Sequence, residues 1–207
     1  MRVTALSDKS DVHVRFDLFE RLNTGGVALT AQEVRACILR GEFNDFLREM
    51  AENGSFRALV KLQERKQHDG TREELVLKSF AYMNDRSQFR GAVGEFLTNY
   101  MATATSRFDY EKGRKLFLAA VNRLAGICKG PFVRTGYANT PLNQFESVMV
   151  ALMELERDGI EVVNPTRGWT NDPSWIDSST AGTNTLPMLK ARIERAKALL
   201  MGHKTSK

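Results

Sequence analysis

Residues 19–41 read FERLNTGGVALTAQEVRACILRG and mark the point where the sequence changes from a strand-like pattern to helical patterns. Two glycines precede a well-signalled helix start, and from Thr30 onward apolar residues recur at helical spacing almost to the end of the chain. Thr30 and Glu33 have the T-x-x-E spacing of a capping box, in which each side chain bonds the backbone N–H of the other residue. The sequence therefore predicts a helix that begins after Thr30 and ends before Gly41.

The turn in front of this helix has two interpretations. The paired glycines allow positive φ, so the chain can turn sharply, and the Asn-Thr pair before them can bond turn backbone groups. One interpretation is a capped loop between packed elements, which the spacing favours because such loops are common. The other is a phosphate site made by the loop amides and nearby arginines. The candidate ligand residues are Arg21, Asn23, Thr24, Gly25, Gly26 and Arg35.

Helical patterns then follow one another along the chain. Thr71 and Glu74 form a second candidate capping box, and Pro187 lies in the first turn of the last pattern, where proline is tolerated. We therefore expect a mainly α fold, with about seven or eight helices in a single domain over residues 19–202. The expected helices cover about 30–40, 42–53, 56–62, 71–83, 91–104, 110–127, 142–158 and 186–200.

The two ends of the chain differ from this pattern. In the strand-like segment 1–18, Val12, Val14 and Phe16 alternate with polar residues, and residues 2–6 form a second candidate strand. One or two strands make no stable sheet alone, so they either pack on the helices or pair with a sheet from elsewhere. Residues 203–207 form a basic tail.

A polar stretch at 160–185 interrupts the helices and contains both tryptophans, Trp169 and Trp175. We expect a long loop whose indoles fold back onto the helices, with base stacking as the alternative. Cys37 and Cys128, the two cysteines, are expected to be core residues and not a disulfide or metal site.

The net charge of +5 has one concentrated source. Residues 186–207 contain six Lys/Arg and one acidic residue, so this segment alone carries +5. Such a helix can bind nucleic acid or dock with its basic side chains snorkelling beside an apolar stripe, and the stripe favours docking. The stripe is Leu189, Ile193, Ala196 and Leu200, and the nucleic-acid candidates are Lys190, Arg192, Arg195 and Lys197.

Other composition features exclude several protein classes. The chain has no apolar run of membrane-spanning length and no signal-peptide core, so a cytoplasmic protein without membrane contact is expected. His13, His68 and His203 are far apart in sequence, and no metal-binding or nucleophile motif occurs. The sequence predicts neither a metal site nor a self-sufficient catalytic site.

The glycine-rich stretch nevertheless resembles a known family. Phe19 and Asn23 match an F-x-x-x-N element, which continues as Thr24-Gly25-Gly26, Leu29-Thr30 and Gln32-Glu33-Val34-Arg35. This run is similar to the N-terminal domain of GmrSD-type restriction proteins. The similarity covers about residues 10–200 and includes Gly41-Glu42-Phe43-Asn44, Glu73-Glu74-Leu75-Val76-Leu77, Phe96-Leu97, Asn99-Tyr100-Met101 and Phe145-Glu146.

The resemblance implies a role in phage defence. Related proteins recognise modified or foreign DNA, hydrolyse nucleoside triphosphates and cut DNA. Their domain pairs a ParB/sulfiredoxin-like α/β half, which carries an Asp-Gly-Gln-Gln-Arg motif, with a helical half. Asp-Gly-Gln-Gln-Arg is absent from these 207 residues, where Asp69-Gly70 continues as Thr-Arg, and no HNH-like histidine cluster occurs.

The resemblance therefore predicts a non-catalytic helical module with no cofactor of its own. A partner α/β half completes the site, and the complex takes a nucleoside triphosphate with magnesium and acts on DNA. Three alternatives are a stand-alone nucleic-acid-binding protein, a small nuclease or nucleotidase, and a decoy that occupies the helical-half interface of a full-length relative.

Overall fold

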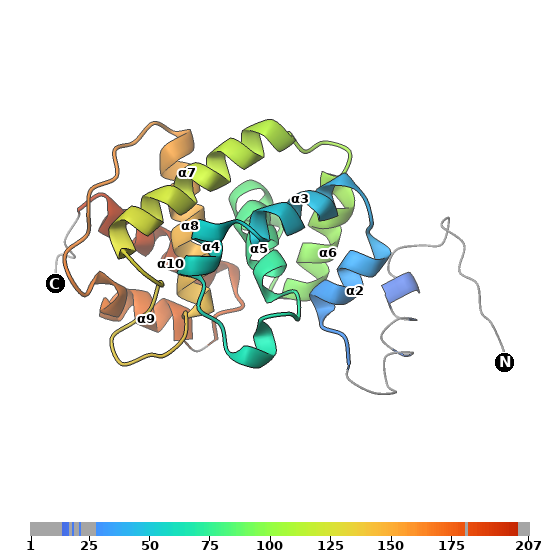
Figure 1. Ribbon diagram of the computed structural model, residues 1–207, viewed down its shortest axis with the longest axis horizontal. Coiled ribbons are helices and arrows are strands. Elements are labelled where there is room, and N and C mark those ends of the chain that lie inside the picture. Colours follow the sequence, from blue (N-terminus) through green and yellow to red (C-terminus); the bar gives the residue numbers. More distant parts are fainter. Residues whose placement is uncertain (1–13, 17, 19–20, 22–27, 181, 203–207) are drawn as a thin grey trace.

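A computed structural model describes residues 14–16, 18, 21, 28–180 and 182–202. Within these residues the secondary structure is helical and no strand occurs, which confirms the predicted mainly α class (Figure 1). Short 3₁₀ helices lie at Glu64–Lys66, Arg86–Gln88 and Trp169–Asn171. The α-helices with printed bounds are α2 (Ala31–Ile38), α3 (Glu42–Ala51), α4 (Gly54–Leu59), α5 (Thr71–Asp85), α6 (Val93–Ala104), α7 (Tyr110–Cys128), α8 (Leu142–Arg157), α9 (Pro173–Thr180) and α10 (Leu186–Leu200).

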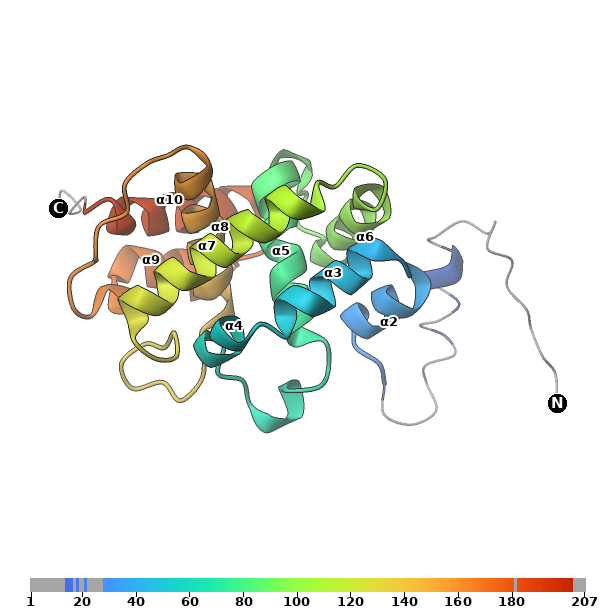
Figure 2. The same cartoon turned by 45° about the horizontal axis from the view of Figure 1, so that its top comes forward.

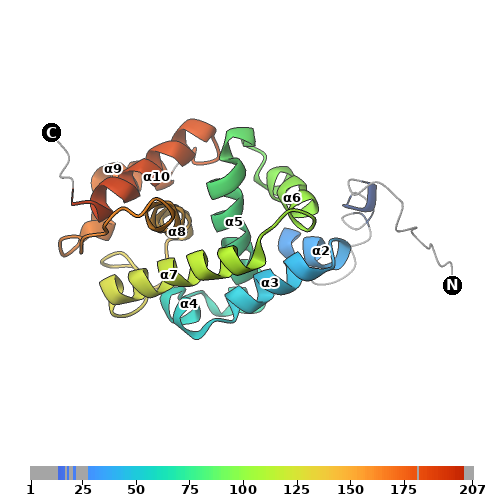
Figure 3. The same ribbon diagram turned by 90° about the horizontal axis from the view of Figure 1, so that it is seen from above.

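Helix α8 is at the centre of one half of the fold. Figure 3 shows it nearly end-on, with α5, α7, α9 and α10 around it. Every residue from Gln144 to Leu155 is buried, including both glutamates of this stretch. A helix that is buried on all sides needs neighbours on all sides. The sequence predicted only one apolar stripe here, so the central position of α8 is a finding of the structure.

Aromatic side chains fill the space between α3, α5 and the start of α7. Phe108 contacts Phe43 and Phe80 edge-on, with ring centroids 4.9 and 5.1 Å apart. Gly113 makes room for this ring, because a Cβ atom there would lie 2.6 Å from Phe108 Cζ. The aromatic cluster thus holds the α6–α7 connection against the core.

The first predicted capping box is confirmed and the second is wrong. Thr30 N–H donates to Glu33 Oε2 at 2.7 Å, and Glu33 N–H donates to Thr30 Oγ1 at 3.3 Å. At the start of α5, however, Gly70 is the N-cap residue with φ of 78°. Thr71 is already helical and its N–H and Oγ1 both donate to Asp69 Oδ1, at 3.0 and 2.6 Å. The nearby aspartate therefore satisfies the groups that a capping box would have bonded.

The predicted strand at residues 11–17 is also wrong where the structure describes it. Val14, Arg15 and Phe16 are helical. An isolated strand leaves its backbone groups unpaired, whereas a helix bonds them locally, and the described part of the chain offers no strand to pair with. Residues 1–13, which include the candidate strand 2–6, and the tail 203–207 lie outside the described residues.

The stretch 160–185 is more ordered than a loop, since it contains α9 and the 3₁₀ helix Trp169–Asn171. Its tryptophans do fold back: the Trp175 side chain is fully buried, stacks on Trp169 at 5.3 Å and donates from Nε1 to Ser147 Oγ at 2.9 Å. Sequence analysis missed α9 because this eight-residue helix has few apolar residues, although Asp172, whose Oδ1 accepts from Trp175 N–H at 2.9 Å, and Pro173 after it are a usable helix-start signal.

The two cysteines are placed differently from one another. Cys128 is half-buried, and burial raises the pKa of its thiol to about 11. Cys37 is exposed, so its predicted core position is wrong. Helix α2 instead turns Gln32, Val34 and Arg35 toward the interior.

Candidate functional site

The predicted ligand residues fall partly outside the described region. Phe19, Asn23, Thr24, Gly25 and Gly26 are not described, and their roles stay predictions. Arg21 is exposed. Thr30 and Glu33 form the capping box described above, and Thr30 Oγ1 also donates to the Asp69 carbonyl at 2.6 Å. The hydroxyl thus ties the start of α2 to the segment that precedes α5.

Arg35 lies in the interior and has partners within the chain. Its side chain is 1 % exposed, and Nε donates to Gln32 Oε1 at 2.9 Å while Nη2 lies 2.5 Å from Glu74 Oε2. Burial lowers the pKa of Arg35, and the charge of Glu74 opposes this shift. The negative charge of Glu74 therefore compensates the buried positive charge of Arg35. The phosphate contact of Arg35 stays a prediction.

Arg35 is the first member of a chain of ion pairs that crosses the molecule. Glu74 Oε1 lies 3.1 Å from Lys78 Nζ, Lys78 Nζ lies 2.8 Å from Glu146 Oε1, and Glu146 Oε2 lies 3.7 Å from Arg192 Nη2. The chain links α2, α5, α8 and α10. We call these five residues the ion chain: Arg35, Glu74, Lys78, Glu146 and Arg192.

The electrostatics of the ion chain follow from its burial. Burial alone would raise the pKa of Glu74, but Lys78 and Arg35 hold it below its usual value. Burial likewise disfavours the charge of Lys78, yet Glu146 and Glu74 raise its pKa well above the ordinary lysine value. Both groups therefore stay charged at neutral pH, and each charge depends on its neighbours.

Sequence analysis missed this network. Glu74 lies in the first turn of α5, where negative charge suits the helix dipole, so its sequence position has a local explanation, whereas Glu146 lies beyond the first turn of α8. The i,i+4 spacing of Glu74 and Lys78 was a usable local signal. The contact between Lys78 and Glu146 joins residues 68 positions apart, and no local pattern reveals it.

The C-terminal helix α10 docks as its apolar stripe predicted, with Leu189, Ile193, Ala196 and Leu200 all buried. Its basic side chains, however, turn toward carboxylates and do not snorkel. Arg195 forms a two-pronged ion pair with Asp172 at 2.8 and 2.5 Å, and Lys197 Nζ lies 2.6 Å from Glu154 Oε2. Arg192 belongs to the ion chain and donates to the Thr183 carbonyl at 2.8 Å. Among the four predicted nucleic-acid residues, Lys190 alone is exposed.

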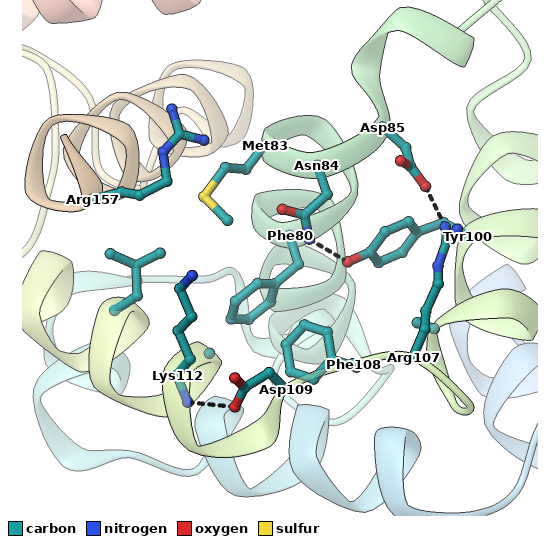
Figure 4. A pocket seen from close by; sticks show the side chains of 13 residues that line it. Phe80, Met83, Asn84, Asp85, Tyr100, Arg107, Phe108, Asp109, Lys112 and Arg157 are labelled. Carbon is teal, nitrogen blue, oxygen red and sulfur yellow. Dashed lines mark hydrogen bonds and ion pairs between the residues drawn. The ribbon is translucent and has the colours of Figure 1, made fainter.

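A cleft of about 310 Å³ lies between α5, α6 and the start of α7 (Figure 4). Phe80, Met83 and Phe108 give it an apolar wall, and the side chains of Arg107 and Lys112 lie at its edge. Arg107 is held by Asp85, with 2.7 Å between Nη2 and Oδ2. The Lys112 ammonium has no ion-pair partner among the described residues.

Two polar side chains line the same cleft from α5 and α6. Asn84 Nδ2 donates to the Tyr100 hydroxyl at 2.8 Å. Burial raises the pKa of Tyr100 to about 12, so the phenol stays protonated at neutral pH. Asp85 and Asp109 line the same cleft as the two cations at its edge, so its lining carries both signs of charge beside the apolar wall.

Comparisons with protein families, curated proteins and solved structures found no match to this chain. Within the described residues, no three His, Cys, Asp or Glu side chains are grouped so that they could hold a metal ion. No described helix has both the length and the apolar character needed to cross a bilayer.

Proposed function

We propose that this chain is the helical module of a GmrSD-like restriction system and that its segment 21–35 faces a partner α/β half. The ion chain supports this proposal. Three separate stretches that carry the family resemblance contribute Arg35, Glu74 and Glu146 to it. Segments that are scattered in the sequence thus meet in one network of ion pairs in the fold.

The ion chain and the capping box also hold the start of α2 in place. Arg35 is fixed by Glu74, and Thr30 is fixed by Glu33 and by the Asp69 carbonyl. The start of α2 is therefore a rigid base for the residues that precede it. Leu29, next to this base, is 39 % exposed. An exposed apolar side chain beside a fixed helix start suits a protein partner.

In the complex, each predicted ligand residue has a distinct task. Asn23 would position a ligand or a loop through its amide, which both donates and accepts hydrogen bonds. Arg21 would contact phosphate charge. The nucleoside triphosphate and its magnesium ion would be bound mainly by the partner half, which supplies the hydrolytic chemistry.

Binding between this chain and an Asp-Gly-Gln-Gln-Arg α/β half tests the proposal. We expect a stoichiometric complex by calorimetry, weakened at least tenfold by Leu29→Asp because a buried carboxylate would lack a partner. Val163→Asp is the matched control, since Val163 is also 39 % exposed but lies after α8. A folded chain that binds no such half, or equal weakening by both variants, would contradict the proposal.

A further inference from the structure

Three connections between helices are joined to one another along one side of the molecule. They are residues 60–67 after α4, residues 129–140 between α7 and α8, and residues 164–171 before α9. The first two lie side by side in Figure 1 and Figure 2. Thr140 N–H donates to the Lys61 carbonyl and Lys61 N–H donates to Thr140 Oγ1, both at 2.9 Å. Phe132 N–H donates to the carbonyl of Leu59, the last residue of α4, at 2.9 Å.

The third connection is bonded to the second in the same way. Asn171 Nδ2 donates to Thr135 Oγ1 at 2.9 Å, and Thr170 Oγ1 donates to the Val133 carbonyl at 3.2 Å. Gln144 Nε2, from buried α8, donates to the Thr170 carbonyl at 3.1 Å. Hydrogen bonds therefore join the three connections to one another and hold them to the buried helix α8.

The surface that the three connections form has a strongly unbalanced charge. Its three segments contain six Lys/Arg and one Glu, which gives 6 − 1 = +5, the same charge as residues 186–207, and the remaining residues of the chain carry 18 − 23 = −5. Among the described residues, none of these six cations forms an ion pair, unlike three of the four basic candidates of α10. The six cations are Lys61, Arg65, Lys66, Lys129, Arg134 and Arg167.

An exposed aromatic ring lies beside one of these cations, Arg134. Tyr137 is 56 % exposed, and the Arg134 guanidinium lies over its ring at 4.0 Å from the centroid. The arginine holds the ring in place by a cation–π contact, which leaves part of the ring surface open to solvent. Aromatic rings flanked by cations are suited to stacking an unpaired base while the cations bind the adjacent phosphates.

We propose that this surface, the basic loop surface, binds single-stranded nucleic acid. The cations contact the phosphate backbone, and Tyr137 together with Arg134 stacks one base. An acidic protein would be bound by the cations alone and would leave the exposed Tyr137 ring without a role. The ring therefore favours a nucleic acid as the ligand. The connection 129–140, which carries Tyr137, lies toward the end of the molecule opposite α2 in both views, whereas the connection 60–67 leads to Asp69, whose carbonyl accepts from Thr30 at the start of α2.

Fluorescence anisotropy with a labelled oligo(dT) tests this inference on the full chain. We expect affinity to fall steeply with salt, because each phosphate contact adds about −0.7 to the slope of log K against log salt. The triple variant Lys61→Gln, Lys129→Gln, Arg167→Gln should lose at least tenfold in affinity and flatten this slope. Tyr137→Ala should lose about tenfold while the slope is unchanged, since stacking involves no counterion release.

A second triple variant removes the same number of charges elsewhere on the molecule. It tests whether the oligonucleotide binds at the basic loop surface or is attracted by the overall positive charge. Arg90→Gln, Lys115→Gln, Arg123→Gln removes three cations that are also exposed and have no ion pair among the described residues. This control should change the affinity less than twofold. The inference is overturned if the control weakens binding as much as the surface variant, if Tyr137→Ala has no effect, or if poly-glutamate competes as well as unlabelled oligo(dT). Binding to the α/β half serves as an independent readout that Tyr137→Ala should not alter, because the connection 129–140 lies at the end of the molecule opposite α2.

Discussion

Glu146→Gln is expected to lower the free energy of unfolding by about 3–5 kcal/mol, because it removes the carboxylate that two buried cations share. Glu146 is 2 % exposed, and it lies between Lys78 and the equally buried Arg192. Glutamine keeps the shape of the side chain but leaves Arg192 without its carboxylate and Lys78 with Glu74 as its one remaining ion-pair partner among the described residues. The loss of one charge therefore destabilises three helices at once, namely α5, α8 and α10.

Urea denaturation followed by circular dichroism measures this effect. Glu49→Gln is the control, because Glu49 also pairs with an arginine, Arg114, at 2.6 Å, but both side chains are exposed. Its unfolding midpoint should hardly change. Adding Lys78→Met to Glu146→Gln should destabilise less than the sum of the two single changes. If Glu146→Gln proves as mild as the control, the ion chain does not hold these helices together.

Trp175→Ala is expected to have a comparable effect, about 3–5 kcal/mol, because it empties a large buried volume. The indole is fully buried, stacks on Trp169 and lies 6.1 Å from the Phe132 ring. It also connects α9 to the central helix through its hydrogen bond to Ser147. The cavity would therefore open where α9 meets α8.

Trp175→Phe provides the comparison in the same urea experiment. Phenylalanine keeps most of the packing and loses the hydrogen bond to Ser147, so this variant should be destabilised by only about 1–2 kcal/mol. Equal losses for the two variants would show that the hydrogen bond, and not the packing of α9, dominates. A loss below about 1 kcal/mol for Trp175→Ala would contradict the packing described for the 160–185 region.

Local signals explain which parts of the fold the sequence predicted. The capping box at Thr30 and Glu33 involves neighbouring residues, and the apolar stripe of α10 repeats at helical spacing. Both can be read along the chain because their partners are close in sequence or share one face of a helix. The eight helices expected from such patterns all have counterparts among α2 to α8 and α10.

Features that depend on distant partners were not predictable in this way. The sequence does not indicate that Arg35 meets Glu74, which is 39 positions away, or that Glu154 receives Lys197. The carboxylate partners of Arg192, Arg195 and Lys197 are also distant in sequence, so these α10 residues were candidates for a nucleic-acid surface. In the structure, the cations without an ion pair include the six of the basic loop surface. At the N-terminus, period-two alternation alone does not distinguish a strand from a helix. A strand also needs a neighbouring strand to bond its backbone groups, and the alternation does not show whether one is present.

The central claim is that this chain is a binding module whose chemistry comes from a partner half. Nucleotide hydrolysis tests it most directly, with GTP and UTP supplied with magnesium to the chain alone and to its complex with an Asp-Gly-Gln-Gln-Arg α/β half. We predict no turnover by the chain alone, and turnover in the complex that Asn23→Ala strongly reduces. Robust turnover by the chain alone, lost in Asn23→Ala, would contradict the account.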